Sequence, residues 1–394
     1  MAFFCNPVGR AAWVAVRRFA SSCAAPTTHS RVAQRGPPQK TRNSLIELSE
    51  NDLGGVLGGS GRARMVWDML RNGDDPLEQA AKLAALPSRS EARESERLVW
   101  DMIQTERGKL RALPISLKVT PLRGHRAVPS PSPAQGGGGD TRHVLTPKTA
   151  QVLRESGLAM PHGEIKTQVV SACGTRKLLI ALQDGLQVEA VLIPSEEHAK
   201  SKRRRTTLCV SSQVGCARGC IFCATGKLGL MRNLTAAEIL LQLFLGAQVA
   251  RQAGLPAITN VVFMGEGEPL NNLRQVAKAA QVMHDPLAFA LSPRRVTVST
   301  VAPSVSHIQR LATLECALAW SLHAADDSIR RRLVPTQTDH VEHLRDAFVK
   351  VLAQRGPGHH LFVEVMLLKG INDSNHDAFK LVRLLEPLRV SGSY

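Results

Sequence analysis

Three cysteines in one short loop form the strongest chemical motif in this chain. Cys216, Cys220 and Cys223 have the spacing C-x3-C-x2-C and directly follow a run that predicts a strand. Thiolates at this spacing ligate three irons of a 4Fe–4S cluster. The fourth iron is then open to a bidentate ligand such as the amino and carboxylate groups of S-adenosylmethionine (SAM). Gly215 and Gly219 relieve crowding where the backbone must wrap around a cluster.

A zinc ion with Cys209 as its fourth ligand is the alternative. Structural zinc normally takes four ligands from paired motifs, and Cys209 lies on the predicted strand, directed along a different path. Four of the eight cysteines fall within the segment 209–223, which is not the distribution of a disulfide framework. The cysteines therefore indicate a reducing compartment and a metal or redox site.

The elements that must position this loop alternate between strand and helix from Thr206 onward. Strands are predicted at 207–211, 259–264, 295–299, 318–322 and 361–367. A helix begins after Thr235, with Glu238 completing a capping box, and ends at Gly254; another begins near Asp339 and ends at Gly356. The alternation predicts an α/β fold of parallel units, in which ligands gather at the carboxyl ends of the strands.

After a leader at 1–43, the residues before this core divide into three segments by composition. We expect a helical accessory domain at 44–126, a Pro/Gly-rich linker or insert at 127–160, and a β-hairpin with a basic loop at 161–205, followed by the core at 206–394. Asp184 and Gly185 supply the hairpin turn between runs at 178–182 and 188–193. The basic loop at 200–205 is either a solvated charge run or a phosphate contact.

The net charge of +17 divides between a leader and the rest of the chain. Seven basic residues and no acidic one precede Glu47, which leaves about +10 for the remainder. This composition predicts an organelle transit peptide at 1–43, disordered and directed to a mitochondrion or chloroplast, with the mitochondrion slightly favoured; a basic tail is the alternative. The remaining charge fits RNA. We expect no membrane span, because Glu238 interrupts the longest apolar run, at 236–250.

The flanks of the cysteine motif carry a family resemblance. The run at 208–216 (LCVSSQVGC), continuing to Arg232, Asn233 and Leu234, resembles the RlmN/Cfr family of radical SAM RNA adenosine C2-methyltransferases. Further matches follow in order at 264–270, 296–300, 321–324 and 370–373. The resemblance covers roughly residue 164 to the end, and more faintly 45–87. It implies a radical SAM partial (β/α) barrel, incomplete at its last strand, preceded by a small helical accessory domain and a β-hairpin.

The resemblance also assigns roles to individual residues. Gly267 and Glu268 match the loop that binds the SAM amino group, where a carboxylate pairs with an ammonium. The other positions that match SAM contacts lie at the ends of predicted strands: Ser299, Ser321, Leu322, His323 and Asn372.

Two further residues match the family's distinctive chemistry. Glu189 matches the proposed proton acceptor, and Cys209 matches the cysteine that resolves a covalent enzyme–RNA adduct. Without the resemblance, Glu189 reads as a solvent-facing strand residue and Cys209 as a small core residue.

The implied reaction methylates C2 of adenosine in large-subunit rRNA and/or tRNA, with a 4Fe–4S cluster and two SAM molecules. One SAM yields a 5′-deoxyadenosyl radical, which takes hydrogen from a methyl group that a second SAM has loaded onto a cysteine. The implied partners are the rRNA or tRNA substrate and an electron donor such as a ferredoxin or flavodoxin system. We expect a monomer that does not associate with a membrane.

The chain departs from the family pattern near its end. The family's methyl-accepting cysteine follows the last barrel strand, whereas no cysteine follows Cys316 and the chain stops at Tyr394. We expect a truncated form whose last parallel strand is left as an open edge. Two alternatives are a SAM- and iron–sulfur-binding protein without methyl transfer and a radical SAM enzyme with another substrate, which the long flank match disfavours.

Overall fold

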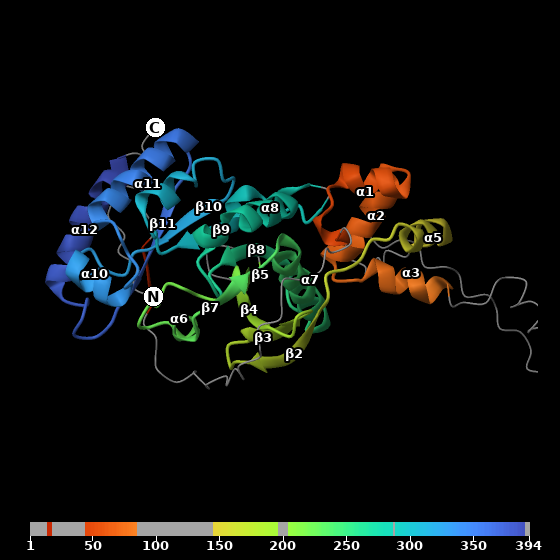
Figure 1. The fold of residues 1–394 in the computed structure, drawn as a ribbon, viewed down its shortest axis with the longest axis horizontal. Helices are drawn as coiled ribbons and strands as arrows, with labels where there is room; N and C mark the ends of the chain where they lie inside the picture. Colours follow the sequence, from red (N-terminus) through yellow and green to blue (C-terminus); the bar gives the residue numbers. More distant parts are fainter. Residues whose placement is uncertain (1–13, 18–43, 85–144, 196–203, 287, 391–394) are drawn as a thin grey trace, which may run out of the picture.

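One nine-stranded sheet organises the molecule in the computed structural model, which describes residues 14–17, 44–84, 145–195, 204–286 and 288–390 (Figure 1). The strand order is β1-β11-β10-β9-β8-β5-β4-β3-β2. Five neighbouring strands are parallel: β5 (Arg205–Cys209), β8 (Ile258–Phe263), β9 (Val296–Thr300), β10 (Ala317–Ser321) and β11 (Leu361–Met366). These are the five predicted strands, so the α/β prediction is confirmed.

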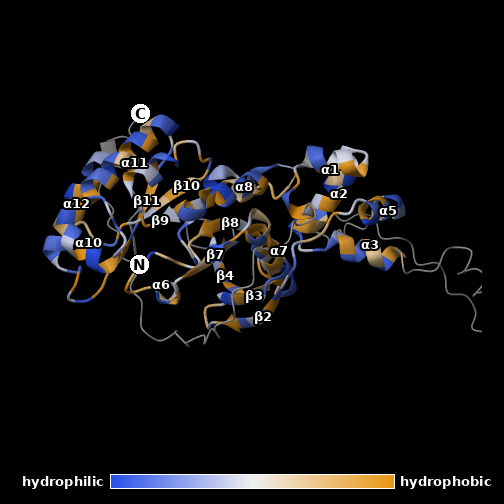
Figure 2. Ribbon diagram, viewed as in Figure 1, coloured by the Kyte–Doolittle hydropathy of each residue, from blue (hydrophilic) through white to orange (hydrophobic). Residues whose placement is uncertain are grey.

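Helices connect the parallel strands and pack against one face of the sheet. They are α7 (Ala236–Gln252), α8 (Leu273–His284), α9 (Val305–Gln309), α10 (Asp327–Leu333), α11 (Val341–Arg355) and α12 (Asn375–Val390), with 3-10 turns η2 (Pro269–Asn272) and η3 (Pro293–Arg295). In Figure 2 the colouring of α10, α11 and α12 mixes polar and apolar residues along each helix, as expected for amphipathic helices.

The predicted helix boundaries are correct for α7 and two residues early for α11. Thr235 Oγ1 accepts a hydrogen bond from Glu238 N at 3.2 Å, and Glu238 accepts one from Thr235 N at 2.8 Å, so the capping box forms. Asp339 does not cap α11; its Oδ2 accepts a hydrogen bond from Val305 N at 2.7 Å instead.

The register of the sheet separates a helix-covered face from an open inner face. Leu208, Val261, Val298, Trp320 and Val363 are at most 2% exposed and lie on the covered face. Paired residues in a sheet point to the same side, and successive residues alternate. Cα pairing therefore places the following side chains together on the inner face: Cys209, Val262, Thr297, Ser299, Ala319, Ser321 and Glu364.

The predicted hairpin is part of the same sheet. Strands β3 (Arg176–Leu182) and β4 (Gln187–Ser195) form it, and β4 pairs antiparallel with β5. A further strand, β2 (Gly163–Val170), pairs with β3. Strand β2 was not predicted, because most of its residues are exposed and the strand therefore lacks a regular alternation of apolar and polar residues.

The accessory region is helical, as predicted, in its described part. It contains η1 (Leu45–Glu47), α1 (Glu50–Leu57), α2 (Ser60–Arg71) and α3 (Pro76–Ala84). The linker prediction is wrong for 147–155, which form helix α5 (Pro147–Glu155) with Thr146 as its N-cap and Pro147 at its first turn. Ala150 and Leu153 are buried, because α5 packs against α3. The low-complexity segment lies outside the described residues.

The far edge of the sheet is paired rather than open. Strand β1 (Val14–Arg17) runs parallel to β11, with Val14 opposite Val363 and Arg17 opposite Met366. Two predictions are therefore wrong: the edge at β11 is not open, and the leader is not disordered throughout. The physical reason is that an edge strand offers unpaired backbone N–H and C=O groups, which another segment of the chain can pair with. The rest of the leader and residues 200–203 of the basic loop lie outside the described residues. No helix among the described residues is long and apolar enough to cross a membrane.

Candidate functional site

The cysteine loop is held by a small antiparallel clamp at the carboxyl end of β5. Strand β6 (Gln213–Gly215) leads into the loop, helix α6 (Ala224–Leu228) leaves it, and β7 (Leu230–Asn233) returns to pair with β6. Cys216 N donates a hydrogen bond to Gly229 O at 2.9 Å, which closes the loop at its base. The three cysteines therefore lie where a parallel sheet places its ligands.

Two glycines of this loop serve different purposes. Gly215 has φ +74°, and a Cβ there would lie 1.9 Å from Gly229 O, so any side chain would force the clamp apart. Gly219 has φ +62°, but no heavy atom lies within 4 Å of its Cβ position. The predicted relief of crowding is thus correct for Gly215, whereas Gly219 is needed only for its left-handed backbone.

The three thiols are close enough to influence one another's ionisation. Cys216 and Cys220 are buried, and Cys223 is half-buried. Burial raises the pKa of Cys220 to about 12, and the neighbouring Cys223 and Cys216 add to this rise. Burial likewise raises the pKa of Cys216, with a contribution from Cys223. Buried thiols such as those of Cys216 and Cys220 become thiolates only opposite a compensating positive charge, and the irons of a cluster provide one.

The arrangement also bears on the zinc alternative. Among the described residues, no three His, Cys, Asp or Glu side chains converge on one position where a metal ion could be held. A cluster does not require such convergence, because each of its irons takes a single thiolate. The donor set and its spacing therefore fit a 4Fe–4S cluster held by Cys216, Cys220 and Cys223.

Helix α10 and the end of β10 support the loop from behind. Ile221 N donates to Leu333 O at 3.2 Å, and Thr336 Oγ1 donates to Arg218 O at 3.1 Å. The Phe222 ring meets the His323 ring edge to face, with centroids 4.7 Å apart. Cys220 shares an apolar cluster with Ala324, Leu333 and Val334. These contacts form an apolar wall on one side of the site and fix its shape.

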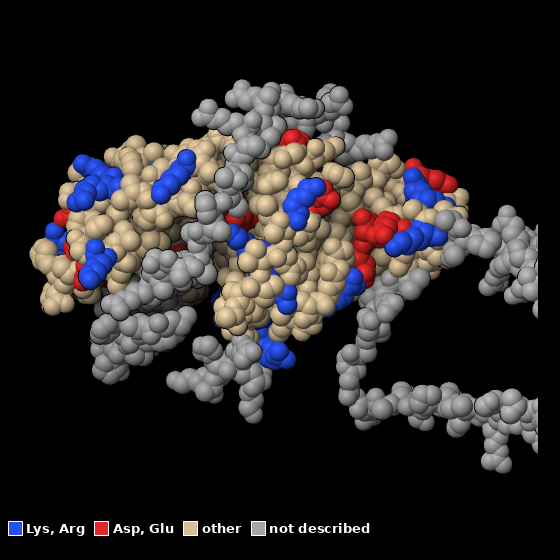
Figure 3. All heavy atoms as spheres, turned by 90° about the horizontal axis from the view of Figure 1, so that it is seen from below, with Lys and Arg blue, Asp and Glu red and all other residues tan. Residues whose placement is uncertain are grey.

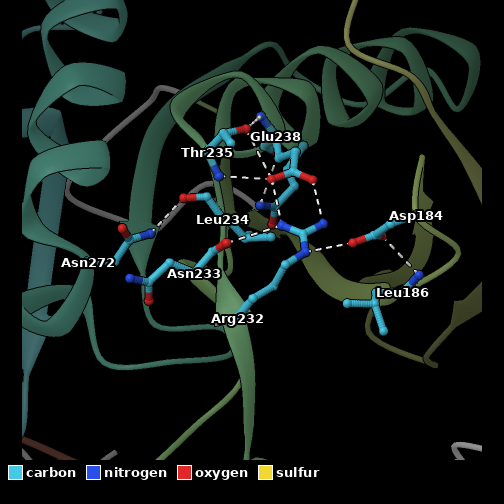
Figure 4. A network of polar contacts seen from close by, with 9 residues as sticks. Asp184, Leu186, Arg232, Asn233, Leu234, Thr235, Glu238 and Asn272 are labelled. Atoms are coloured by element: carbon cyan, nitrogen blue, oxygen red, sulfur yellow. Dashed lines mark hydrogen bonds and ion pairs between the residues drawn. The ribbon is translucent and has the colours of Figure 1, made fainter. Parts of the chain in front are cut away.

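Arg232 connects the clamp to the rest of the sheet (Figure 4). Its Nη1 and Nη2 donate to Glu238 at 2.9 and 2.7 Å, and its Nε donates to Asp184 Oδ2 at 2.7 Å. Asn272 Nδ2 donates to Leu234 O at 2.8 Å and to Ser212 O at 2.7 Å, so it bridges the two sides of the clamp. Arg232, which belongs to the matched motif, therefore serves to position the clamp rather than to contact a ligand.

Glu268, predicted to bind the SAM ammonium, is buried in the loop after β8. Its Oε1 accepts from Leu270 N and its Oε2 from Val301 N, both at 2.9 Å. Burial raises the pKa of this carboxyl. A carboxylate oxygen can accept a second hydrogen bond, so these contacts leave capacity for an ammonium. Gly267, at φ +97°, is needed because a Cβ there would lie 2.6 Å from Gln213 Cβ.

The predicted SAM contacts at the ends of β9 and β10 come together. Ser299 Oγ and Ser321 Oγ are 3.1 Å apart on the inner face. Leu322 is fully buried, and its N donates to Glu364 O at 3.0 Å. The two hydroxyls thus form a polar pair at the carboxyl ends of adjacent strands, where a ligand could be hydrogen-bonded.

His323 and Asn372 lie beside this pair, after the ends of β10 and β11, and hold the two strand ends together. Burial, together with the charge of Arg330, lowers the pKa of His323 to about 3, so the ring is neutral near pH 7. Its Nδ1 accepts from Met366 N at 3.3 Å, which leaves the proton on Nε2. Asn372 Nδ2 donates to His323 O at 2.6 Å and to Met366 O at 2.8 Å. Both amide protons of Asn372 therefore join strand ends, and its Oδ1 already accepts from Leu368 N at 2.7 Å, so a ligand could use only the second lone pair of that oxygen.

A cavity of about 740 Å³ lies beside these two residues. His323 and Asn372 line it together with apolar side chains of α12, including Phe379 and Leu385. Its volume is within the range of sites that hold a cofactor-sized molecule.

Glu189 and Cys209 lie on the same face of the sheet. Cys209 is paired with Val191, and Glu189 is two residues from Val191 on β4, so both side chains point to the inner face. Lys177 Nζ donates to Glu189 Oε1 at 2.9 Å, and the Glu189 side chain is 31% exposed. The structure thus brings the two residues to one face, beside the strand end that leads to the cysteine loop.

Two buried charged residues were missed by the sequence analysis. Glu266 lies between Gly265 and Gly267 and is 7% exposed. Arg330 is fully buried, and its guanidinium donates to Leu322 O, Gln337 Oε1 and Val301 O. The signal for Glu266 was its place between two glycines of a matched motif. In the sequence, Arg330 is the first of three consecutive arginines in a helical segment, a pattern typical of an exposed helix face.

Cys316 lies far from the inner carboxyl edge. It immediately precedes β10 and is therefore at the amino end of the parallel strands, opposite the cysteine loop. Burial raises its pKa to about 12, and its thiol contacts His284 Nε2 at 3.5 Å. Its position at the amino end of the strands is poorly suited to a methyl-accepting cysteine.

Comparison with known proteins assigns this site to a class. Residues 210–382 match the radical SAM superfamily, a segment that begins just before the cysteine loop and ends in α12. A crystal structure of a radical SAM methyltransferase from Sphaerobacter thermophilus aligns with a TM-score of 0.60 and 28% identity, covering 88% of this chain and 82% of that one. The fold and the cysteine loop are those of a radical SAM protein.

Two curated relatives identify the family. The chain is 38% identical over 258 residues to the ribosomal RNA large subunit methyltransferase N of Nitrosopumilus maritimus, covering 64% of this chain and 70% of that protein. It is 44% identical over 237 residues to the probable dual-specificity RNA methyltransferase RlmN of Moorella thermoacetica, covering 58% and 64%. The chain belongs to the RlmN family of radical SAM methyltransferases. It spans 64% of the Moorella protein and 60% of a relative from Solidesulfovibrio magneticus.

The two loop glycines provide a matched test of the clamp. Gly215→Ala should lose most of the iron that the protein binds after anaerobic reconstitution, because the new Cβ would overlap Gly229 O. Gly219→Ala should keep most of its iron, since it pays only the left-handed backbone cost of about 1–2 kcal/mol. Iron per chain is the measurement. Equal iron in the two variants would show that the Gly215–Gly229 contact does not hold the loop.

Arg232 provides a test of how the clamp is anchored. Arg232→Met should lower the free energy of unfolding by about 2 kcal/mol, because it leaves two half-buried carboxylates without their partner. Urea denaturation measures this, with Lys82→Met as the control. Lys82 pairs with Glu78 on an exposed surface at 2.6 Å, and its loss should cost at most about 0.5 kcal/mol. A cost for Arg232→Met no larger than this control would contradict the anchoring role.

Proposed function

We propose that this chain carries the catalytic core of an RNA adenosine C2-methyltransferase that acts on large-subunit rRNA, tRNA or both. The observation that supports this best is the shared inner face of the sheet. Glu189, Cys209, Ser299 and Ser321 all point to it, beside the loop with three thiols. A generic radical SAM site would need the thiols and the SAM contacts but not the paired acid and thiol on β4 and β5.

The residues of the site would have different roles according to their positions. Cys216, Cys220 and Cys223 would hold the cluster, which with SAM would supply a radical that takes hydrogen from a methyl group, a step that polar chemistry cannot perform. Glu268 would accept hydrogen bonds from the SAM ammonium, and neutral His323 would donate from Nε2 without adding charge.

Glu189 and Cys209 would act on the RNA base. Glu189 would accept a proton from the methylated base, with Lys177 holding the carboxylate in position through the ion pair at 2.9 Å. Cys209 would act as the thiol nucleophile that resolves the covalent adduct between the RNA base and the methyl-carrying cysteine that the resemblance implies, by forming a disulfide with that cysteine and releasing the base.

The charge of the chain favours an RNA substrate without locating the contact surface. About +10 remains outside the leader. Figure 3 shows Lys and Arg side chains spread over one face in separate positions, with acidic side chains between them. The relatives from Nitrosopumilus and Moorella are named as rRNA and dual-specificity RNA methyltransferases, which supports RNA as the substrate class.

The second candidate is a protein that binds SAM and an iron–sulfur cluster without transferring a methyl group. Cys316 immediately precedes β10, so it lies at the amino end of the parallel strands, opposite the inner carboxyl edge to which a methyl group must be delivered. The two candidates share the cluster site and differ only in methyl transfer.

The organelle address, the electron donor and the oligomeric state complete the proposal. The acid-free leader at 1–43 supports import into a mitochondrion or chloroplast. A ferredoxin or flavodoxin system would supply the electron, and the protein would act as a monomer.

One experiment separates the two candidates. The anaerobically reconstituted protein is incubated with SAM, a reductant and organellar RNA, and C2-methyladenosine is measured by mass spectrometry alongside 5′-deoxyadenosine. We expect both products, and we expect Cys220→Ala to lose the brown cluster absorbance and both products. Formation of 5′-deoxyadenosine without methylated RNA would favour the second candidate. A Cys220→Ala variant that keeps its cluster would refute the ligand assignment.

A further inference from the structure

Glu266 joins three parts of the site through one buried carboxylate. Its Oε1 accepts a hydrogen bond from Glu189 N on β4, and its Oε2 accepts one from Gly215 N next to the cysteine loop, both at 3.2 Å. Its own backbone lies between Gly267 and the end of β8. The carboxylate therefore links the strand of the proposed proton acceptor, the loop of the proposed SAM contact and the base of the cysteine loop.

A second route joins the same two residues through Ser211. The Ser211 hydroxyl donates to Glu189 O at 2.6 Å and accepts from Glu266 N at 2.9 Å. Both the N–H and the C=O of Glu189 are thus held by Glu266, one directly and one through Ser211. A displacement of Glu266 would move the backbone of Glu189 with it.

The loop that carries Glu266 has no room to shift. A Cβ at Gly265 would lie 2.7 Å from Ser211 Oγ, and one at Gly267 would lie 2.6 Å from Gln213 Cβ. Glu266 O also accepts from Ser212 N at 2.8 Å and Gln213 N at 3.2 Å. The backbone is therefore fixed on both sides, and the two N–H donors, from Glu189 and Gly215, set the position of the carboxylate.

The charges around Glu266 couple it to Glu189. Burial raises the pKa of Glu266 to about 7, and the negative charge of Glu189 adds to the rise. The N–H groups of Gly215 and Glu189 and the charge of Lys177 oppose it. Glu189 and Lys177 are the charged residues that face this carboxyl, and Lys177 also pairs with Glu189.

We propose that Glu266 is a positioning residue for Glu189: its buried carboxylate fixes the backbone of β4 and so holds the Glu189 side chain in place on the inner face. This inference rests on the proposed function, in which Glu189 receives the proton from the methylated base. The effect of Glu266 on that proton passes through the position of Glu189.

The first test needs neither cofactor nor RNA. Glu266 binds its proton more tightly in the folded chain than in the unfolded one, where its pKa is about 4.5. Its contribution to stability is therefore fully present below pH 4.5 and is lost as the pH rises through about 7. The melting temperature of the full unloaded chain should fall by several degrees between pH 5 and 8, and Glu266→Gln should remove that part of the slope.

Glu189→Gln tests the coupling in the same assay. Loss of the Glu189 charge lowers the proton affinity of Glu266, so the fall in melting temperature should move to lower pH. The control is Glu164→Gln, which removes an exposed carboxylate on β2 and should leave the curve unchanged. If Glu266→Gln does not fold, the comparison of wild type with Glu189→Gln still decides the question. An unmoved curve in Glu189→Gln would overturn the proposal.

The second test uses the loaded protein and separates positioning from general structure. The wild-type methylation rate should rise as the pH rises through about 7, because only the ionised Glu266 carboxylate can accept from both N–H groups, and Glu266→Gln, which keeps one acceptor oxygen, should lack this rise. A wild-type pH profile retained in Glu266→Gln would overturn the proposal. If the wild type methylates no RNA, the proposed function fails, and the melting curves still establish or refute the coupling.

Discussion

The contact between the backbones of Gly215 and Gly229 is the constraint on which the site depends. At this point β6 and β7 approach so closely that no side chain fits, and the hydrogen bond from Cys216 N closes the loop immediately beyond it. Every cysteine of the triad lies between these two glycines in the sequence. The geometry of the loop is therefore set by backbone packing, and the cluster would enter a frame that already exists.

Buried charge holds this frame against the sheet. Glu266 and Glu268 are both buried, and their carboxylates accept hydrogen bonds from backbone N–H groups rather than from cationic side chains. Arg330 is the converse case, because its guanidinium donates to the carbonyl groups at the ends of β9 and β10. Each buried charged side chain thus hydrogen-bonds backbone groups of loops that have no partner in a neighbouring strand. The same groups that stabilise the loops also place the inner face and the cysteine loop side by side.

Local signals in the sequence predicted the elements that depend on local physics. The five core strands were found from their apolar runs, α7 from Thr235 and Glu238, and the β3–β4 turn from Asp184 and Gly185. Strand β2 and helix α5 were missed or assigned to other structure. Strand β2 is exposed along most of its length, and α5 is a short amphipathic segment beside a low-complexity stretch whose Pro147 reads equally well as a linker residue or a helix start. The pairing of β1 with β11 was not predictable, because the two segments are more than 340 residues apart.

By itself the sequence determined the chemistry, namely three thiols at a spacing that suits an iron–sulfur cluster and flanks that indicate a family. Residue type and short-range spacing are written directly in the chain, so this inference needed no coordinates. Only the tertiary structure decided which residues share a surface. It placed Glu189 and Cys209 on one face, committed both amide protons of Asn372 to strand ends, and put Cys316 at the opposite end of the sheet. It also revealed Glu266, whose partners lie 51 and 77 residues away along the chain. Such contacts arise from strand register and loop packing, which local sequence patterns do not encode.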